Sequence, residues 1–97
     1  MLVMETDKVI SALRSKTRRE ILQILAGEPK TVQEVMESLP QKRVKIKYRE
    51  SVYKALEKLV DAGLVDKYYE KEKGICYKLS KTRLEIDLSN GVVEYIQ

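Results

Sequence analysis

The 97-residue sequence predicts an α+β fold, in which about four helices are followed by two β-hairpins. Up to Gly63, apolar residues recur at helical spacing between capping residues, glycines and prolines. After Gly63, the pattern changes to short runs of β-forming residues separated by turn sequences. The length suits one domain over residues 1–97, with its core in residues 6–81 and a C-terminal hairpin extension in residues 82–97.

The first two predicted helices start at polar residues that can cap them. The first can begin at Thr6 or Asp7, and the second follows Ser15 and stops at Gly27. The apolar side chains expected to face the core from these helices are Val9, Ile10, Leu13, Ile21, Leu22, Ile24 and Leu25.

A capping box marks the start of the third predicted helix. In "TVQE", Thr31 places a hydroxyl at the N-cap, and Glu34 places a carboxylate three residues later. The apolar residues that follow at helical spacing are Val32, Val35, Met36 and Leu39. Pro40 discourages continuation of this helix.

The stretch "RESVYKALEKLVDAGLV", residues 49–65, predicts a fourth, amphipathic helix that stops at Gly63. Its apolar face consists of Val52, Ala55, Leu56, Leu59, Val60 and Ala62. The start of this helix is open, because Tyr48 is a poor capping residue. Either Ser51 caps a shorter helix, or the helix begins near Lys47, since Tyr48 falls on the apolar side of the helical wheel.

Two hairpins are predicted after the fourth helix. "LVDKYYE" and "ICYKLS" are rich in β-forming residues and flank the turn "KEKG". The tail alternates apolar and charged residues before Asn90-Gly91, a strong hairpin-turn signal. In the first hairpin we expect Tyr77 to lie in the core and Cys76 to be either a packed side chain or a surface thiol.

The composition excludes several functional classes. The chain has no histidine, and its single cysteine excludes an internal disulfide and a cysteine-cluster metal site. No nucleophile motif, paired-carboxylate spacing or phosphate-binding glycine loop stands out, so we expect neither catalysis nor a cofactor. No apolar run approaches the ~18 residues of a membrane span, and "MLVM" is too short for a signal peptide, so a cytoplasmic location is expected. Abundant Lys and Glu with one Asn hint at a thermophilic source.

The net charge of +4 is distributed unevenly. Residues 41–60 carry seven basic and two acidic side chains, whereas residues 82–97 carry one basic and three acidic. This local concentration favours a nucleic-acid partner. In "QKRVKIKYR", residues 41–49, apolar residues alternate with cations, so an extended arm can point its cations toward phosphate. The alternative is a solvated insertion without a partner.

Four stretches resemble the winged helix-turn-helix domain of ArsR-type transcriptional repressors. They are "SKTRREILQIL" (15–25), "TVQEVMESL" (31–39), "ESVYKALEKLVDAGLV" (50–65) and "GICYKLS" (74–80). The resemblance implies a recognition helix at about residues 50–62 in the major groove of double-stranded DNA, and a bracing helix at residues 31–39. It also implies that a basic turn, residues 41–49, and a wing, residues 66–78, lie on the DNA backbone, and that the protein is a homodimeric regulator.

The sequence departs from that family in three places. Metal-sensing members use cysteine or histidine pairs, and "VQEVMESL" has none, so no metal is expected by that motif. The segment from Pro40 to Glu50 has eleven residues, where a helix-turn-helix turn usually has about three or four. Tyr48 occupies the position of the usual serine-like cap.

The candidate DNA contacts come from three segments. They are Lys42, Arg43, Lys45, Lys47 and Arg49 in the basic turn, Ser51, Tyr53, Lys54 and Lys58 on the recognition helix, and Lys71 and Lys73 at the wing. Tyr53 and Lys54 lie near the N-terminus of the recognition helix and are expected to read bases, while Lys58 meets phosphate. Glu57 and Asp61 would repel a backbone unless cations pair with them, and the expected cation is either Lys54, beside Glu57, or Lys58, between Glu57 and Asp61. The alternative is a mixed-charge solvated face.

Three further alternatives stay open at the level of sequence. Arg18 and Arg19 can either contact phosphate or lie on a solvated helix face. A dimer contact can come from the acidic tail or from "MLVM" with the first helix. The alternative function is a winged-helix protein-interaction module that binds an acidic protein partner.

Overall fold

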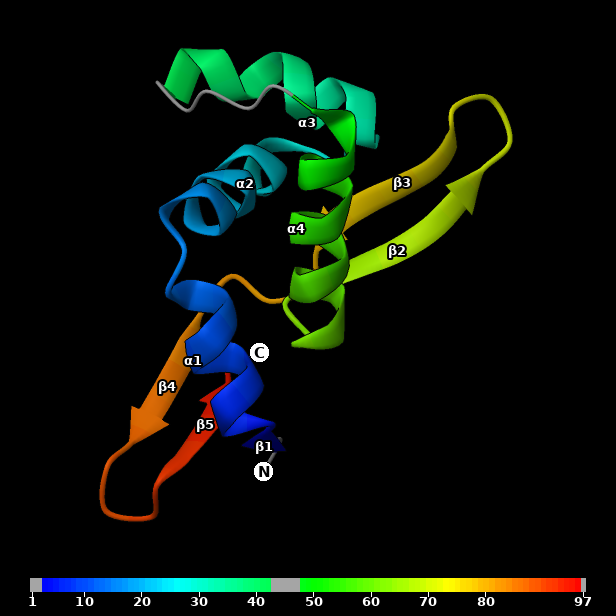
Figure 1. Ribbon diagram of the computed structural model, residues 1–97. Coiled ribbons are helices and arrows are strands. Elements are labelled where there is room, and N and C mark those ends of the chain that lie inside the picture. The colour runs from blue at the N-terminus through cyan, green and yellow to red at the C-terminus, as the bar shows by residue number, and fades with distance from the viewer. Residues whose placement is uncertain (1–2, 43–47, 97) are drawn as a thin grey trace.

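The computed structural model describes residues 3–42 and 48–96, and it confirms four helices followed by two hairpins (Figure 1). The helices are α1 (Thr6–Leu13), α2 (Lys16–Gly27), α3 (Val32–Ser38) and α4 (Arg49–Asp61), with a 3-10 turn, η1 (Leu39–Lys42), after α3. The strands are β1 (Val3–Met4), β2 (Val65–Glu70), β3 (Gly74–Leu79), β4 (Leu84–Asp87) and β5 (Val92–Tyr95). Together they form an α+β winged-helix fold, with β2 and β3 as the wing.

The apolar faces of the four helices meet in one core. Its most buried side chains include Val9, Ala12, Ile21, Val35, Leu39, Val52, Leu56, Leu59 and Tyr77, each at most 1% exposed. The helical-wheel predictions for α3 and α4 are therefore confirmed at their central positions. Tyr77 is the largest of the fully buried side chains, so its predicted place in the core is also confirmed.

The prediction for α1 was partly wrong. Ile10, which we expected to be buried, is 48% exposed, whereas Val9 and Ala12 are buried. Because α1 has only eight residues and packs through the face that carries Val9 and Ala12, Ile10 falls on the flank of this helix. The helix begins at Thr6, as one alternative had it, but Glu5 is the N-cap and makes no side-chain capping bond.

Two arginines join α2 to the end of α1. Ser15 caps α2 as predicted, since its Oγ accepts a hydrogen bond of 3.2 Å from the backbone N–H of Arg18. The Arg18 guanidinium donates to the carbonyl oxygens of Ala12 at 2.8 Å and Ser11 at 2.9 Å. Arg19 donates to two more carbonyl oxygens there, at 2.6 and 3.0 Å. These bonds satisfy carbonyls that a helix C-terminus leaves without partners.

The end of α4 is a Schellman motif around Gly63. The N–H of Gly63 donates to the carbonyl of Val60, and the N–H of Leu64 donates to the carbonyl of Leu59, each at 3.0 Å. Gly63 has φ of 80°, a left-handed conformation that glycine adopts without a steric penalty. Leu59 and Leu64 are both buried, which adds the apolar contact typical of this motif. The predicted stop at Gly63 is confirmed.

The wing is anchored at its base by a third chain segment. β2 and β3 pair antiparallel from Val65–Leu79 at the base to Glu70–Gly74 near the tip. Lys30, between α2 and α3, forms an isolated bridge with Tyr77 through two backbone hydrogen bonds of 2.8 and 2.9 Å. The wing is therefore attached both to α4 and to the connection that precedes α3.

The C-terminal hairpin, β4 and β5, belongs to a sheet with a third strand that the sequence did not predict. β1 pairs with β5, so the sheet has the order β1-β5-β4. Val93 in β5 and Met4 in β1 lie opposite each other and join this sheet to the helical core. Figure 1 shows the β4–β5 hairpin extending away from the helices, at the end of the molecule opposite α3.

Candidate nucleic-acid interface

Helix α4 begins at Arg49, directly after Tyr48, and so matches neither alternative that the sequence left open. Tyr48 occupies the N-cap position in an extended conformation, and its side chain makes no capping bond. Ser51 lies inside the first turn, where its backbone N–H donates to the carbonyl of Tyr48 at 3.1 Å. Neither a cap at Ser51 nor a start near Lys47 is observed. The segment 43–47 of the basic turn lies outside the described residues.

The outer face of α4 carries Ser51, Tyr53, Lys54 and Lys58, all of which are exposed. Three carboxylates also lie on this helix, Glu50, Glu57 and Asp61, and each forms an ion pair with a lysine. Glu50 Oε1 lies 3.3 Å from the Nζ of Lys54, one turn further on. Asp61 Oδ1 lies 3.4 Å from the Nζ of Lys8 in α1. The predicted Lys54–Glu57 pair is wrong, because Lys54 pairs with Glu50 instead.

Glu57 connects α4 to the wing. Its Oε1 lies 3.1 Å from the Nζ of Lys67 in β2, and its Oε2 accepts a 2.9 Å hydrogen bond from the hydroxyl of Tyr77 in β3. The Lys67 ammonium also lies 5.5 Å from the ring centroid of Tyr53, within cation–π range. The hydrogen bond to Glu57 raises the pKa of Lys67, and burial raises the pKa of Tyr77, so both groups stay protonated donors.

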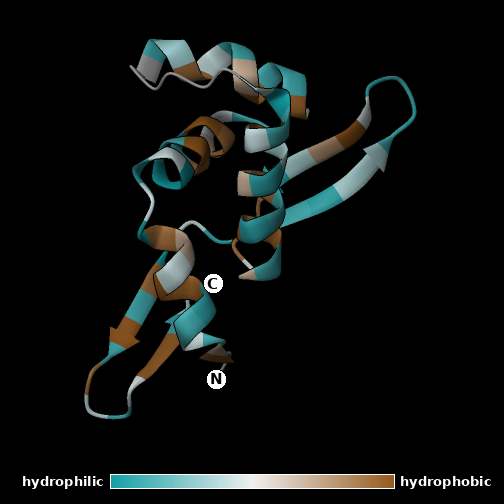
Figure 2. Cartoon of the chain, viewed as in Figure 1, coloured by the Kyte–Doolittle hydropathy of each residue, from teal (hydrophilic) through white to brown (hydrophobic). Residues whose placement is uncertain are grey.

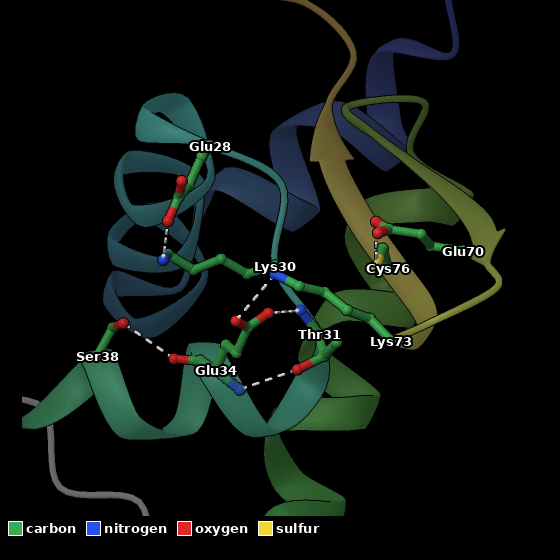
Figure 3. A network of polar contacts seen from close by, with 8 residues as sticks. All are labelled: Glu28, Lys30, Thr31, Glu34, Ser38, Glu70, Lys73 and Cys76. Atoms are coloured by element: carbon green, nitrogen blue, oxygen red, sulfur yellow. Dashed lines mark hydrogen bonds and ion pairs between the residues drawn. The ribbon is translucent and has the colours of Figure 1, made fainter.

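A second set of polar contacts joins the wing tip to the start of α3 (Figure 3). The predicted capping box is confirmed: Thr31 Oγ1 accepts from the Glu34 N–H at 3.1 Å, and Glu34 Oε1 accepts from the Thr31 N–H at 3.0 Å. The other carboxylate oxygen of Glu34 lies 3.4 Å from the Nζ of Lys73. The hydrogen bond from the Thr31 backbone holds the pKa of Glu34 below its usual value.

These contacts surround a groove of about 680 Å³ between α3, α4 and the wing. Its cationic lining comes from Arg49, Lys67 and Lys73. Its apolar lining includes Ile75, 44% exposed on the wing, and the ring of Tyr53. The groove thus combines aromatic and aliphatic surface with three cations and the carboxylate of Glu50. Two of the cations, Lys67 and Lys73, already form ion pairs, with Glu57 and Glu34.

The structure brings some of the predicted contact residues together and separates others. Arg49, Tyr53 and Lys73 line the groove. Lys54 and Lys58 lie on α4, and Lys71 lies in the turn at the wing tip. Three of the predicted contacts, Arg43, Lys45 and Lys47, fall outside the described residues, and Lys42 closes η1 just before them.

Sequence reasoning missed Lys67 as a residue of this surface. The sequence pattern that could have indicated Lys67 is the alternation along β2, which places residues 65, 67 and 69 on the same face of the strand. That face turns toward α4, since Lys67 lies opposite Tyr77 in the hairpin and both line the groove. Cys76 faces the other side and is buried, and its burial raises the pKa of the thiol.

Comparison with known protein families gives a match that covers the helices bordering the groove. The family described as the helix-turn-helix domain matches residues 13–68, which include α2, α3, α4 and most of β2. The chain belongs to the helix-turn-helix domain family. Membership in this family indicates a DNA-binding regulator in general rather than an enzyme. No curated protein matches the chain. Within residues 3–42 and 48–96 of this helix-turn-helix protein, no helix is long and apolar enough to cross a membrane.

Proposed function

We propose that this helix-turn-helix protein is a sequence-specific DNA-binding transcriptional regulator of the ArsR-like type that acts in the cytoplasm as a homodimer. In this proposal one domain comprises residues 1–97, with a winged-helix core in residues 6–81 and an extension in residues 82–97. α4 enters the major groove, and the basic turn and the wing lie on the backbone.

The ion pairs of α4 are the observation that carries this proposal. Each of its three carboxylates is paired with a lysine, so their repulsion of phosphate is reduced. Within the described part of the chain, Arg49 and Lys58 form no ion pair, and both are exposed. The polar face of α4 contains both acidic and basic residues, but its acidic residues are paired with lysines. The positive charges of Arg49 and Lys58 therefore remain unpaired within the described residues.

The groove beside α4 supports the same docking. A sugar-phosphate strand has an anionic edge and an apolar sugar edge, and the groove offers Arg49, Lys67 and Lys73 beside Tyr53 and Ile75. We propose that one strand passes between α4 and the wing, with Lys73 exchanging Glu34 for phosphate. Lys67 borders this strand while it keeps its ion pair with Glu57, and Lys71 at the wing tip is a further contact predicted from sequence.

Base reading is assigned to the first turns of α4. Ser51, Tyr53 and Lys54 are exposed there, and side chains near the N-terminus of a recognition helix reach base edges most directly. Lys58, further along the helix, is assigned to phosphate. With one recognition helix in each chain, a homodimer would place two of them on half-sites about 34 Å apart.

The experiment is fluorescence anisotropy with labelled duplex DNA over a series of salt concentrations. Wild-type affinity should fall linearly with salt on a double-logarithmic plot, and Lys58→Ala should lower the slope by about 0.9 for each phosphate that the variant no longer binds. Replacing Arg43, Lys45 and Lys47 together should flatten the plot further. Lys16→Ala is the matched control, because Lys16 is an exposed lysine of α2 outside both α4 and the wing, and it should leave the slope unchanged.

Sequence specificity requires a second comparison. Selection from a pool of random duplexes should enrich a two-fold-related site, and Tyr53→Ala should reduce the preference for that site more than the salt slope. Absence of binding to any duplex at low salt would overturn the proposal. Equal binding to all duplexes would overturn its sequence-specific part.

A further inference from the structure

Among the strands that the structure describes, none pairs with the outer edge of β4. β5 lies in the middle of the C-terminal sheet, with β1 on one side and β4 on the other. The β1 edge has only two residues, whereas β4 has four. Natural edge strands are commonly protected by lysine, proline or a bulge. The stretch "LEID" of β4, Leu84–Asp87, contains neither lysine nor proline, and Glu85 and Asp87 are its only charged residues.

An apolar stripe follows this edge out of the core. Residues directly opposite each other in antiparallel strands share a face, so Ile86 lies on the same face as its partner Val93. Val93 is 1% exposed, yet Ile86 is 59% exposed, and Leu88 beyond it is 90% exposed. Leu84, at the inner end of the stripe, packs against the core. Figure 2 shows hydrophobic colour along β4 and β5 where the hairpin leaves the helices.

We propose that β4 pairs antiparallel with β4 of a second copy of this chain, around a two-fold axis. A two-fold interface needs the same patch on both subunits to be self-complementary, and each copy offers one open edge and one apolar stripe. The pairing would join the three-stranded sheets of the two copies into one continuous sheet and cover Ile86 and Leu88 of both. This inference deepens the homodimer of the proposed function, on which it rests, by naming its interface.

The charges along β4 suit this arrangement. Arg83 precedes the strand, and Glu85 and Asp87 follow at alternate positions on the same face, so the strand has a basic end and an acidic end. Antiparallel pairing centred on Glu85 places Arg83 of each copy opposite Asp87 of the other, on both sides of the two Glu85 side chains that meet at the axis. A parallel arrangement would instead place like charges together. The hairpin also lies at the opposite end of the molecule from α3, so this interface leaves the start of α4 uncovered (Figure 1).

The test is the molar mass in solution without DNA, measured by light scattering after gel filtration over a range of protein concentrations. We expect a dimer with twice the 11.3 kDa of one chain. Ile86→Lys should raise the dimer dissociation constant at least about tenfold, because it places one lysine from each copy in the apolar stripe beside the two-fold axis. Leu88→Lys is a second variant at an exposed turn residue, where folding does not depend on the side chain.

Ile75→Lys is the matched control, since Ile75 is an exposed isoleucine of the other hairpin. It should leave the dimer intact, and circular dichroism should show that all three variants are folded. A wild-type protein that stays monomeric at every concentration would overturn the proposal. So would folded Ile86→Lys and Leu88→Lys variants that remain dimeric. Because no DNA is present, these outcomes are independent of whether the protein binds DNA.

Discussion

The hydroxyl of Tyr77 in the wing donates a hydrogen bond of 2.9 Å to Glu57 in α4. Lys67, on the neighbouring strand, binds the other oxygen of the same carboxylate at 3.1 Å. One acidic side chain of α4 is thus held by both strands of the wing. Lys67 offsets the negative charge of Glu57, and the two contacts together fix the direction in which the wing leaves the helix.

Tyr77→Phe tests the energy of this connection. The variant keeps the buried ring and removes only the hydroxyl, so the free energy of unfolding should fall by about 1 kcal/mol. Urea denaturation measures this change. Tyr69→Phe is the control, because Tyr69 is 69% exposed, and its effect should stay within about 0.5 kcal/mol. Equal effects of the two substitutions would contradict the assigned role of the hydroxyl.

Arg18→Ala tests whether this arginine serves α1 or DNA. Without its bonds to the carbonyls of Ala12 and Ser11, the free energy of unfolding should fall by about 1 kcal/mol. DNA affinity, measured well below the unfolding temperature, should be unchanged. Lys16→Ala, at the start of the same helix, is the stability control. A weaker DNA affinity with unchanged stability would instead identify Arg18 as a phosphate contact.

Two glycine-to-alanine substitutions should have opposite signs. Gly63→Ala should destabilise the fold by about 1 kcal/mol, because its φ of 80° is costly for a residue with Cβ, and the new Cβ would meet Met4 Cε at 3.4 Å. Gly27→Ala should stabilise it by about 0.5 kcal/mol, because Gly27 lies in α2 with no atom within 4 Å of an added Cβ. Thermal unfolding of both variants checks the pair. Changes of the same sign would refute the explanation.

The capping box should make stability depend on acid pH. The Thr31 backbone N–H and Lys73 both lower the pKa of Glu34 from 4.5. A carboxylate with a lowered folded pKa stabilises the protein above its unfolded value and loses this contribution as pH falls through the folded pKa. The stability difference between wild type and Glu34→Gln should therefore be full above pH 4.5 and shrink below it.

Thermal unfolding midpoints measured from neutral pH downward check this expectation. Lys73→Gln is the matched variant, since it removes the ion pair but leaves the bond from Thr31, the largest cause of the lowered pKa. It should keep most of the pH dependence of the wild type. A wild type and Glu34→Gln variant that differ equally at all pH values would show that the charge of Glu34 does not matter.

Local sequence patterns were sufficient for the helices and hairpins, because each depends on neighbours along the chain. The Thr31 capping box, the Gly63 stop and the Asn90-Gly91 turn involve residues at most a few positions apart. β1 was missed because two residues cannot show a period. Ile10 was misplaced because the short α1 uses only one narrow face.

The candidate site was less predictable, because its contacts join distant parts of the chain. Glu57 and Tyr77 are 20 residues apart, and Glu34 and Lys73 are 39 apart. Helical spacing suggested Lys54 as the partner of Glu57, but the wing supplies Lys67 once the fold is formed. The positive character of α4 therefore depends on tertiary contacts and cannot be read from its own residues.

The bridge between Lys30 and Tyr77 holds the wing below its tip, so the fold does not depend on the sequence of the turn at the tip. The base of the hairpin is fixed by that bridge and by the pairing of Val65 with Leu79, whereas the turn between Glu70 and Gly74 carries no core residue. A foreign loop grafted into this turn would leave the helical scaffold and the register of the strands intact. Divergence of the loop alone would then give related proteins different outer contacts on one unchanged framework.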